Sequence, residues 1–180
     1  MKLFSSGDRR AILIGRFQPL HTGHIYAIKQ ILDENQEIVI AIGSAQASHT
    51  LENPLTAGER VYMIHKTLVE EKLELSRIYI ITVPDIQYNS IWPMHVKTYS
   101  PPFSIVYTGN SLVKTLFEEL GYHVKRPNLY LREKCSGTNI RKLMLVGNPE
   151  WRNYVPKTVA IIAEELKLEE RLKNIATKLD

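Results

Sequence analysis

Short apolar runs alternate along the chain with segments whose apolar residues recur every three or four positions. The runs are typical of strands buried on both faces, and the longer spacing is typical of helices with one buried face. We expect strands over residues 11–15, 37–43, 77–83, 104–109 and 122–124. We expect helices from residue 23, after residue 56, and over 91–99, 112–120, 136–146 and 156–179.

This alternation of strands and helices with short connections predicts an α/β fold with a doubly wound parallel sheet. Ligands of such sheets bind at the carboxyl ends of the strands. The expected organisation is an N-terminal extension (1–10), one domain (11–155) and a C-terminal helix packed on it (156–180).

Composition narrows the class of protein. Apolar residues make up 44% and charged residues 23% of the 180 residues, which suits one globular domain. No apolar run approaches the ~20 residues that span a membrane. The chain start lacks the apolar segment of a secretory signal, and Cys135 is the single cysteine, so we expect a cytoplasmic protein. A net charge of +4 favours anionic ligands.

The most informative segment joins the first strand to the first helix, from Gly15 to His24. A helix start offers free N–H groups and the positive end of the dipole to anions. His21 and His24 are three residues apart and should face the same way, and Gly15 and Gly23 allow close backbone approach. A chance surface pair and a zinc site are the alternatives; no third zinc ligand is evident nearby.

The string Gly15-Arg16-Phe17-Gln18-Pro19-x-His21-x-Gly23-His24 resembles the signature of archaeal-type nicotinamide mononucleotide adenylyltransferases. These enzymes belong to the nucleotidyltransferase superfamily with a His-x-Gly-His motif and a Rossmann-like fold. The resemblance implies that His21 and His24 bind the phosphates of ATP, that the second histidine is central to catalysis, and that Arg16 lies beside them. It also implies that Gly15, Phe17 and Gly23 belong to the ATP site.

A second segment, Cys135 to Arg141, precedes the fifth expected helix. Ser136 or Thr138 can cap this helix without any ligand; with Arg141 they would form a second anion receiver. The segment resembles the Ser-x-Thr-x-x-Arg element of the same superfamily, which implies contacts to the β- and γ-phosphates. Gly137 stands where the broader superfamily often has a second serine. No base is identifiable for Cys135 as a nucleophile.

Polar residues also follow the other expected strands. Each of these residues also has an ordinary interpretation without a ligand, as part of a turn, a helix cap or the core. For Arg60 that interpretation is a solvated side chain. The resemblance assigns one set to the nicotinamide mononucleotide pocket, with the face of Trp92 suited to stacking on a nicotinamide ring, and a second set to the ATP side. The first set is Gly43, Ser44, Arg60, Asp85, Asn89 and Trp92; the second is Gly109 and Asn110.

The expected reaction is ATP plus nicotinamide mononucleotide giving NAD and pyrophosphate, with Mg²⁺ held by the ATP phosphates and water rather than by protein ligands. The resemblance also implies a homo-oligomer, often a hexamer in the family. Two alternatives stay open. One is a sibling enzyme with another acceptor such as phosphopantetheine; the other is a non-catalytic nucleotide- or nucleic-acid-binding domain. No basic run supports nucleic-acid binding, and no membrane partner is expected.

Overall fold

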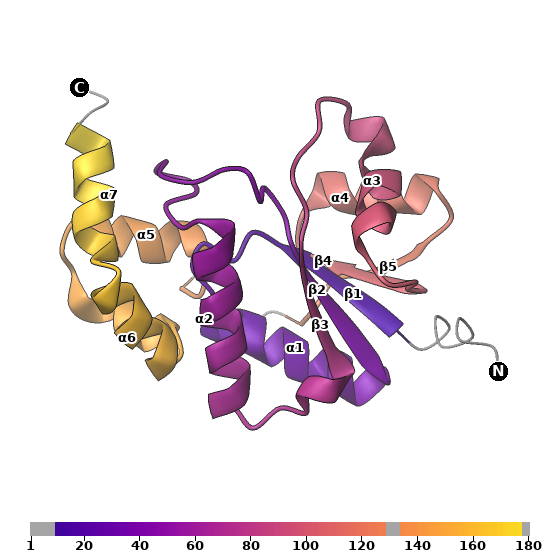
Figure 1. Ribbon diagram of the computed structural model, residues 1–180, viewed down its shortest axis with the longest axis horizontal. Coiled ribbons are helices and arrows are strands. Elements are labelled where there is room, and N and C mark those ends of the chain that lie inside the picture. Colours follow the sequence, from indigo (N-terminus) through magenta and orange to yellow (C-terminus); the bar gives the residue numbers. More distant parts are fainter. Residues whose placement is uncertain (1–9, 129–133, 178–180) are drawn as a thin grey trace. The chain divides into compact units, whose positions relative to one another are not determined.

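The computed structural model describes residues 10–128 and 134–177, and Figure 1 shows its elements. Five strands form one parallel sheet in the order β3-β2-β1-β4-β5. The strands are β1 (Arg10–Gly15), β2 (Glu37–Ile42), β3 (Ile78–Thr82), β4 (Ile105–Thr108) and β5 (His123–Lys125). The expected parallel sheet is confirmed. Arg10, which was expected in the extension, instead begins β1, and its side chain forms an ion pair with Glu37.

The strand order places the switch point of the sheet between β1 and β4. Chain connections leave β1 toward β2 on one side and reach β4 on the other. In doubly wound sheets the ligand crevice lies at this point, at the carboxyl ends of the strands. Gly15 ends β1, and Gly109 follows β4 directly.

Helices cover both faces of the sheet. Val106 packs in a core cluster with Trp92 and Val96 of α3 (Trp92–Tyr99) and with Leu116 and Phe117 of α4 (Ser111–Glu119). The next residue, Tyr107, donates its hydroxyl proton to Glu34 at the end of α1 (Thr22–Glu34). Successive strand side chains point to opposite faces, so α1 covers the face away from α3 and α4, as Figure 1 shows.

Side-chain caps fix where several helices begin. Thr56 and Glu59 form the expected capping box of α2 (Ala57–Glu70). The side chain of Asn110 caps α4, and that of Ser136 caps α5 (Gly137–Leu145). Short 3₁₀ helices lie at Leu75–Arg77 (η2), Asn89–Ile91 (η3) and Pro149–Tyr154 (η4).

The expectation of one long C-terminal helix over 156–179 is wrong as far as residue 177. The segment forms α6 (Lys157–Glu165) and α7 (Leu168–Thr177), and between them Lys167 adopts a left-handed φ of 50°. The break lets two apolar stripes be buried against different neighbours. α6 packs against α2, whereas α7 packs against α5. The last residues of the expected helix lie outside the described residues.

Contacts divide the chain into two compact units. We call residues 10–15, 27–45 and 74–128 the sheet unit, and residues 16–26, 46–73 and 134–177 the helical unit. The expected linear division at residues 10 and 155 stays a prediction, and residues 1–9 lie outside the described part. Within the described ranges, the helices are all too short or too polar to cross a membrane.

Candidate active site

The loop that follows β1 is held rigidly within the helical unit. Phe17 has a left-handed φ of 52°, and its side chain is buried. The buried amide of Gln18 forms two hydrogen bonds with the backbone of Leu55: Nε2 donates to the carbonyl at 2.9 Å, and Oε1 accepts from the N–H at 3.0 Å. The loop that leads into α1 is therefore fixed to the segment before α2.

The two histidines form a stacked pair at the first turn of α1. The ring centroids of His21 and His24 lie 3.5 Å apart with an interplanar angle of 22°. The backbone N–H of His21 donates to Nδ1 of His24 at 3.2 Å, and Phe17 packs against the His24 ring with centroids 4.6 Å apart. The expectation that both rings face the same way is confirmed.

Burial keeps both imidazoles uncharged at neutral pH. It lowers the pKa of His21 to about 4, and burial together with repulsion from His21 holds the pKa of His24 well below its ordinary value. Nδ1 of His21 is buried and has no hydrogen-bond partner among the described residues. The pair is therefore suited to offer neutral N–H donors to an anion. A bound anion would in turn favour the protonated forms of the two rings.

Two buried arginines donate hydrogen bonds to backbone carbonyls of the loop. Arg60 is fully buried, and it donates from Nη1 to the carbonyl of Arg16 at 3.0 Å and from Nε to that of Thr56 at 3.2 Å. Arg141 donates from Nη1 to the carbonyl of Gln18 at 2.7 Å and from Nε to that of Leu51. The interpretation of Arg60 as a solvated side chain is wrong. By contrast, the guanidinium of Arg16 is exposed, 3.5 Å from Glu52.

The start of α5 lies against the same loop. A Cβ on Gly137 would come within 2.9 Å of the Gln18 carbonyl oxygen, which explains why glycine stands there rather than serine. The Ser136 hydroxyl accepts from the Asn139 N–H, and Thr138 is exposed. The starts of α1 and α5 are thereby brought together, each presenting N–H groups that helices leave unpaired.

Cys135 is a buried neighbour of this helix start rather than a reactive group. Its side chain is 6% exposed, and burial raises the pKa of its thiol. The Gly23 N–H at the first turn of α1 hydrogen-bonds to it. A thiol with a raised pKa is a poor nucleophile, which agrees with the expectation from sequence.

The remaining predicted site residues belong to the sheet unit, at the carboxyl ends of its strands. After β2, the Gly43 N–H donates to the carbonyl of Gly15, and Ser44 has a left-handed φ. Asp85 and Asn89 after β3 are exposed, as is Gly109 after β4. The side chain of Asn110 caps α4 by accepting from the N–H groups of Leu112 and Val113.

Trp92 fits the core interpretation. The residue is 8% exposed, and its ring meets that of Phe117 edge-on, with centroids 6.1 Å apart. Its assignment to the mononucleotide stays a prediction. Sequence reasoning gave no role to Glu52, Arg171 or the side chain of Gln18. Only Gln18 carried a signal, because it lies inside the motif itself.

A parallel sheet of this order, with a histidine pair at its first helix start, defines a nucleotidyltransferase-like protein. The cytidylyltransferase-like family model matches residues 12–143. The relatives include proteins named nicotinamide-nucleotide adenylyltransferase from Ignicoccus hospitalis (51% identity; 94% of this chain, 99% of that protein) and Methanothrix thermoacetophila (50%; 94% and 98%). Within the cytidylyltransferase-like class, the chain belongs to the nicotinamide-nucleotide adenylyltransferase family.

A solved structure shares the fold at low sequence identity. It is a bifunctional NMN adenylyltransferase/ADP ribose pyrophosphatase from Francisella tularensis, complexed with AMP and a manganese ion. The TM-score is 0.70 at 19% identity, and the match covers 92% of this chain and 52% of that one. This likeness supports the Rossmann-like nucleotidyltransferase fold.

Proposed function

We propose that the protein transfers the adenylyl group of ATP to nicotinamide mononucleotide, forming NAD and pyrophosphate. The observation that carries the proposal is the stacked His21–His24 pair at the start of α1, set against the start of α5. Similarity to nicotinamide-nucleotide adenylyltransferases over nearly the whole chain supports the choice of substrates.

The reaction is an in-line displacement at phosphorus. A 5′-phosphate oxygen of the mononucleotide forms a bond to the α-phosphorus of ATP, and the bond from that phosphorus to the bridging β-oxygen breaks. The electron pair leaves with pyrophosphate. Because the attacking phosphate is already anionic, no general base is required, and catalysis consists of positioning and charge stabilisation.

The predicted phosphate-binding residues of the helical unit each have a role in this scheme. His24 accepts at Nδ1 from the loop, so its Nε2–H is the donor to a phosphate oxygen. His21 and the exposed Arg16 guanidinium bind neighbouring phosphate oxygens. The β- and γ-phosphates bind to Ser136, Thr138 and the N–H groups that begin α5. The buried positive charge of Arg141 also favours the binding of these phosphates.

We assign the magnesium ion of this scheme to the substrate rather than to a cage of protein ligands. Within residues 10–128 and 134–177, no three His, Cys, Asp or Glu side chains gather as a metal-binding group. The charged and ring side chains of the loop itself, Arg16, His21 and His24, offer nitrogen atoms, whereas Mg²⁺ prefers oxygen ligands. We propose that Mg²⁺ arrives with ATP, held by phosphates and water, and we derive no catalytic step through it.

The acceptor half of the proposal rests on the sheet unit. Asp85 and Asn89 are exposed after β3, where a ligand of the sheet is expected, and we assign them with Gly43 and Ser44 to the mononucleotide. Arg60 belongs to the helical unit, where it donates to the carbonyls of Arg16 and Thr56, and its assignment to the mononucleotide stays a prediction. We further expect the enzyme to act in the cytoplasm, which the single cysteine favours, and to form a homo-oligomer, as the family resemblance implies.

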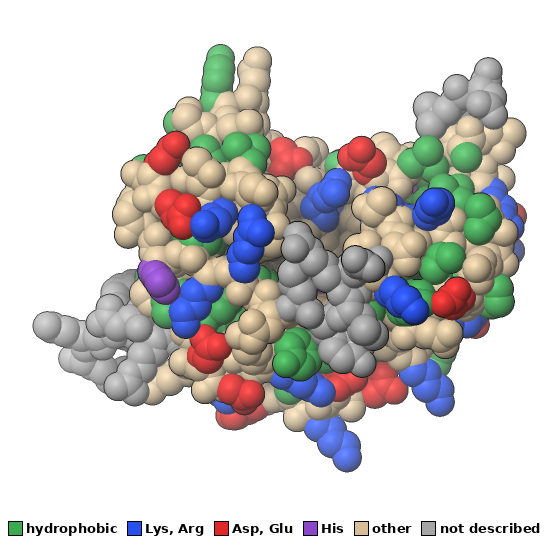
Figure 2. Space-filling model, turned by 180° about the vertical axis from the view of Figure 1, so that it is seen from behind, with side chains coloured by type: hydrophobic (Ala, Val, Ile, Leu, Met, Phe, Trp, Pro, Cys, Tyr) green, Lys and Arg blue, Asp and Glu red, His purple; other side chains and the backbone are tan. Residues whose placement is uncertain are grey.

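The alternatives have less support. Three of the similar proteins are named nicotinamide-nucleotide adenylyltransferase, which favours the mononucleotide over a pantetheine acceptor. Figure 2 shows basic side chains with acidic ones beside them within each part of the described chain. Nucleic-acid binding favours a stripe of one sign, and this mixed pattern does not support it.

Pyrophosphate release from Mg-ATP tests the proposal directly. The acceptors are nicotinamide mononucleotide, its deamidated analogue, phosphopantetheine and none, with NAD quantified by an independent method. We expect release with nicotinamide mononucleotide in step with NAD. Release with phosphopantetheine alone would establish the sibling activity instead. No release with any acceptor would reject adenylyl transfer.

A further inference from the structure

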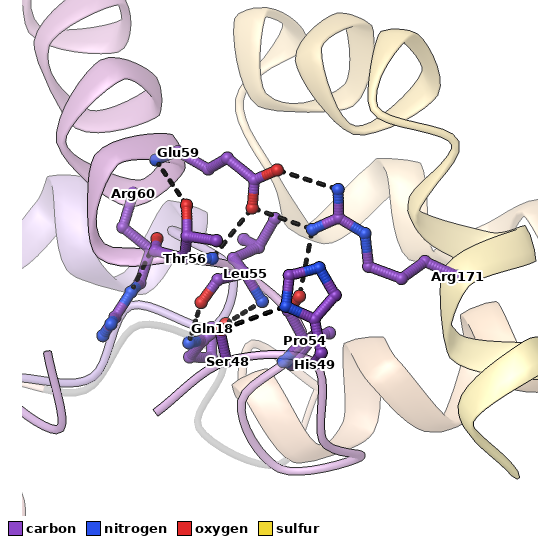
Figure 3. Close-up of polar contacts among 9 residues, drawn as sticks. All are labelled: Gln18, Ser48, His49, Pro54, Leu55, Thr56, Glu59, Arg60 and Arg171. Carbon is purple, nitrogen blue, oxygen red and sulfur yellow. Dashed lines mark hydrogen bonds and ion pairs between the residues drawn. The ribbon is translucent and has the colours of Figure 1, made fainter. Parts of the chain in front are cut away.

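Arg171 of α7 forms three hydrogen bonds within the helical unit. Its Nη1 and Nη2 each donate to a carboxylate oxygen of Glu59 at 2.8 Å, and Nη1 also donates to the carbonyl of Pro54 at 3.0 Å (Figure 3). Both charged side chains are 19% exposed. A bidentate pair of this kind fixes orientation as well as charge, so α7 holds the start of α2 in one position.

The carboxylate that Arg171 binds also begins α2. One oxygen of Glu59 accepts from the backbone N–H of Thr56 at 2.8 Å, while the Thr56 hydroxyl accepts from the Glu59 N–H. The hydrogen bonds from Arg171 are the main reason that the pKa of Glu59 is lowered. The capping box and the ion pair therefore share one ionised group, and they reinforce each other.

Two short paths lead from this group to the loop before His21, and Figure 3 shows the one that runs through Leu55 to Gln18. Leu55, between Pro54 and Thr56, forms both backbone hydrogen bonds with the Gln18 side chain. Arg60, next to Glu59, donates to the carbonyl of Arg16. Arg171 thus stabilises, through segment 54–60, the backbone of Arg16 and the side chain of Gln18.

We infer that Arg171, although it lies on the C-terminal helix, is a positioning residue for the binding of the ATP triphosphate and acts through segment 54–60. The inference rests on the proposed function of the loop. Without the guanidinium, Pro54 and Glu59 lose a common anchor, and the loop that presents Arg16 and His21 gains freedom. ATP binding must then order that loop, which weakens affinity for ATP.

The test compares Arg171→Met and Arg171→Lys with a matched arginine variant. Arg152→Met serves as the control, because Arg152 pairs with Glu164 and Glu169 and packs over Trp151 in the same unit. The readouts are KM for ATP, KM for the mononucleotide, kcat and the midpoint of thermal unfolding. Assays run well below every midpoint.

We expect Arg171→Met to raise KM for ATP about tenfold, which corresponds to about 1.4 kcal/mol of binding free energy needed to order the freed loop, with a much smaller change in KM for the mononucleotide. The KM for ATP of Arg171→Lys should lie between those of the wild type and Arg171→Met, because one ammonium group cannot replace the bidentate contact. Arg152→Met should leave both KM values unchanged even where it lowers the midpoint. Adding Glu59→Gln to Arg171→Met should raise KM for ATP little further.

Equal changes in the two KM values, or none in KM for ATP, would overturn the inference. If Arg171→Met does not fold, Arg171→Lys and Glu59→Gln carry the same test. Equilibrium binding of Mg-ATP to each variant separates this inference from the proposed reaction. A wild-type protein that binds Mg-ATP but transfers nothing would reject the reaction, and the effect of Arg171 would still be read from the binding constant.

Discussion

The backbone N–H of His21 donates to Nδ1 of His24 at 3.2 Å, and this bond fixes which nitrogen of His24 carries the proton. An accepting Nδ1 is unprotonated, so in a neutral ring the proton resides on Nε2. The ring is uncharged at neutral pH because burial lowers its pKa. His24 therefore acts as an oriented neutral donor in the free enzyme.

This orientation predicts different outcomes for two amide substitutions of His24. The amide of glutamine can donate near the position of Nε2, whereas that of asparagine lies near Nδ1 and cannot. We expect His24→Asn and His24→Ala to lower kcat by about 10²–10³, as for loss of one donor to a charge-developing oxygen. His24→Gln should retain more activity. Steady-state kinetics with thermal unfolding as the folding control test this, and equal activity of the two amides would contradict it.

Gly137 is predicted to resist even a small side chain. A Cβ there would lie 2.9 Å from the Gln18 carbonyl oxygen and 3.0 Å from Nη1 of Arg141. Because the obstacle is backbone, Gly137→Ser should destabilise the protein by about 1–3 kcal/mol and raise KM for ATP. Gly58→Ala in α2 is the control, since a Cβ there meets nothing within 4 Å. Denaturant unfolding measures both, and an unchanged stability for Gly137→Ser would disprove the clash.

The histidine pair predicts a pH dependence of stability. An unfolded histidine binds its proton near pH 6.5, whereas the pKa of folded His21 is lowered to about 4. Between these values the unfolded chain binds more protons, so the free energy of unfolding falls as the pH falls from about 6.5 toward 4. His21→Gln should flatten the curve between pH 7 and 5, above the range where most carboxylates titrate. A slope unchanged by His21→Gln would reject this.

Trp92 needs a substitution that separates packing from stacking. Truncation to alanine would remove a core side chain packed against Phe117 and cost about 3–5 kcal/mol. Trp92→Phe keeps an aromatic face, and Trp92→Leu keeps an apolar side chain without one. If the ring stacks on nicotinamide, KM for the mononucleotide rises in the leucine variant and much less in the phenylalanine variant, with KM for ATP steady. Equal KM values for the mononucleotide in the two variants would show that Trp92 serves only as a core residue.

The sequence predicted the sheet well because its strands are continuous apolar runs, such as Ile38 to Ile42, whose meaning does not depend on distant residues. It misjudged the C-terminal helix because the apolar spacing continues across Lys167, and the left-handed φ there follows from packing against α2 and α5. The bonds of Arg171 to Glu59 and Pro54 join residues more than a hundred positions apart. No local pattern indicates such a contact.

Glu52 stands beside the exposed guanidinium of Arg16, with Oε2 3.5 Å from Nη1 and side chains 77% and 48% exposed. An exposed pair of this kind contributes little to stability. The Glu52 carboxylate nevertheless repels a triphosphate bound by Arg16. We expect Glu52→Gln to lower KM for ATP about threefold at low salt, with a difference that shrinks at high ionic strength because salt screens exposed charges. The exposed Glu165 at the end of α6 provides the control, Glu165→Gln. A higher KM for ATP in Glu52→Gln would show instead that the carboxylate assists binding, as an oxygen ligand for the Mg²⁺ of Mg-ATP would.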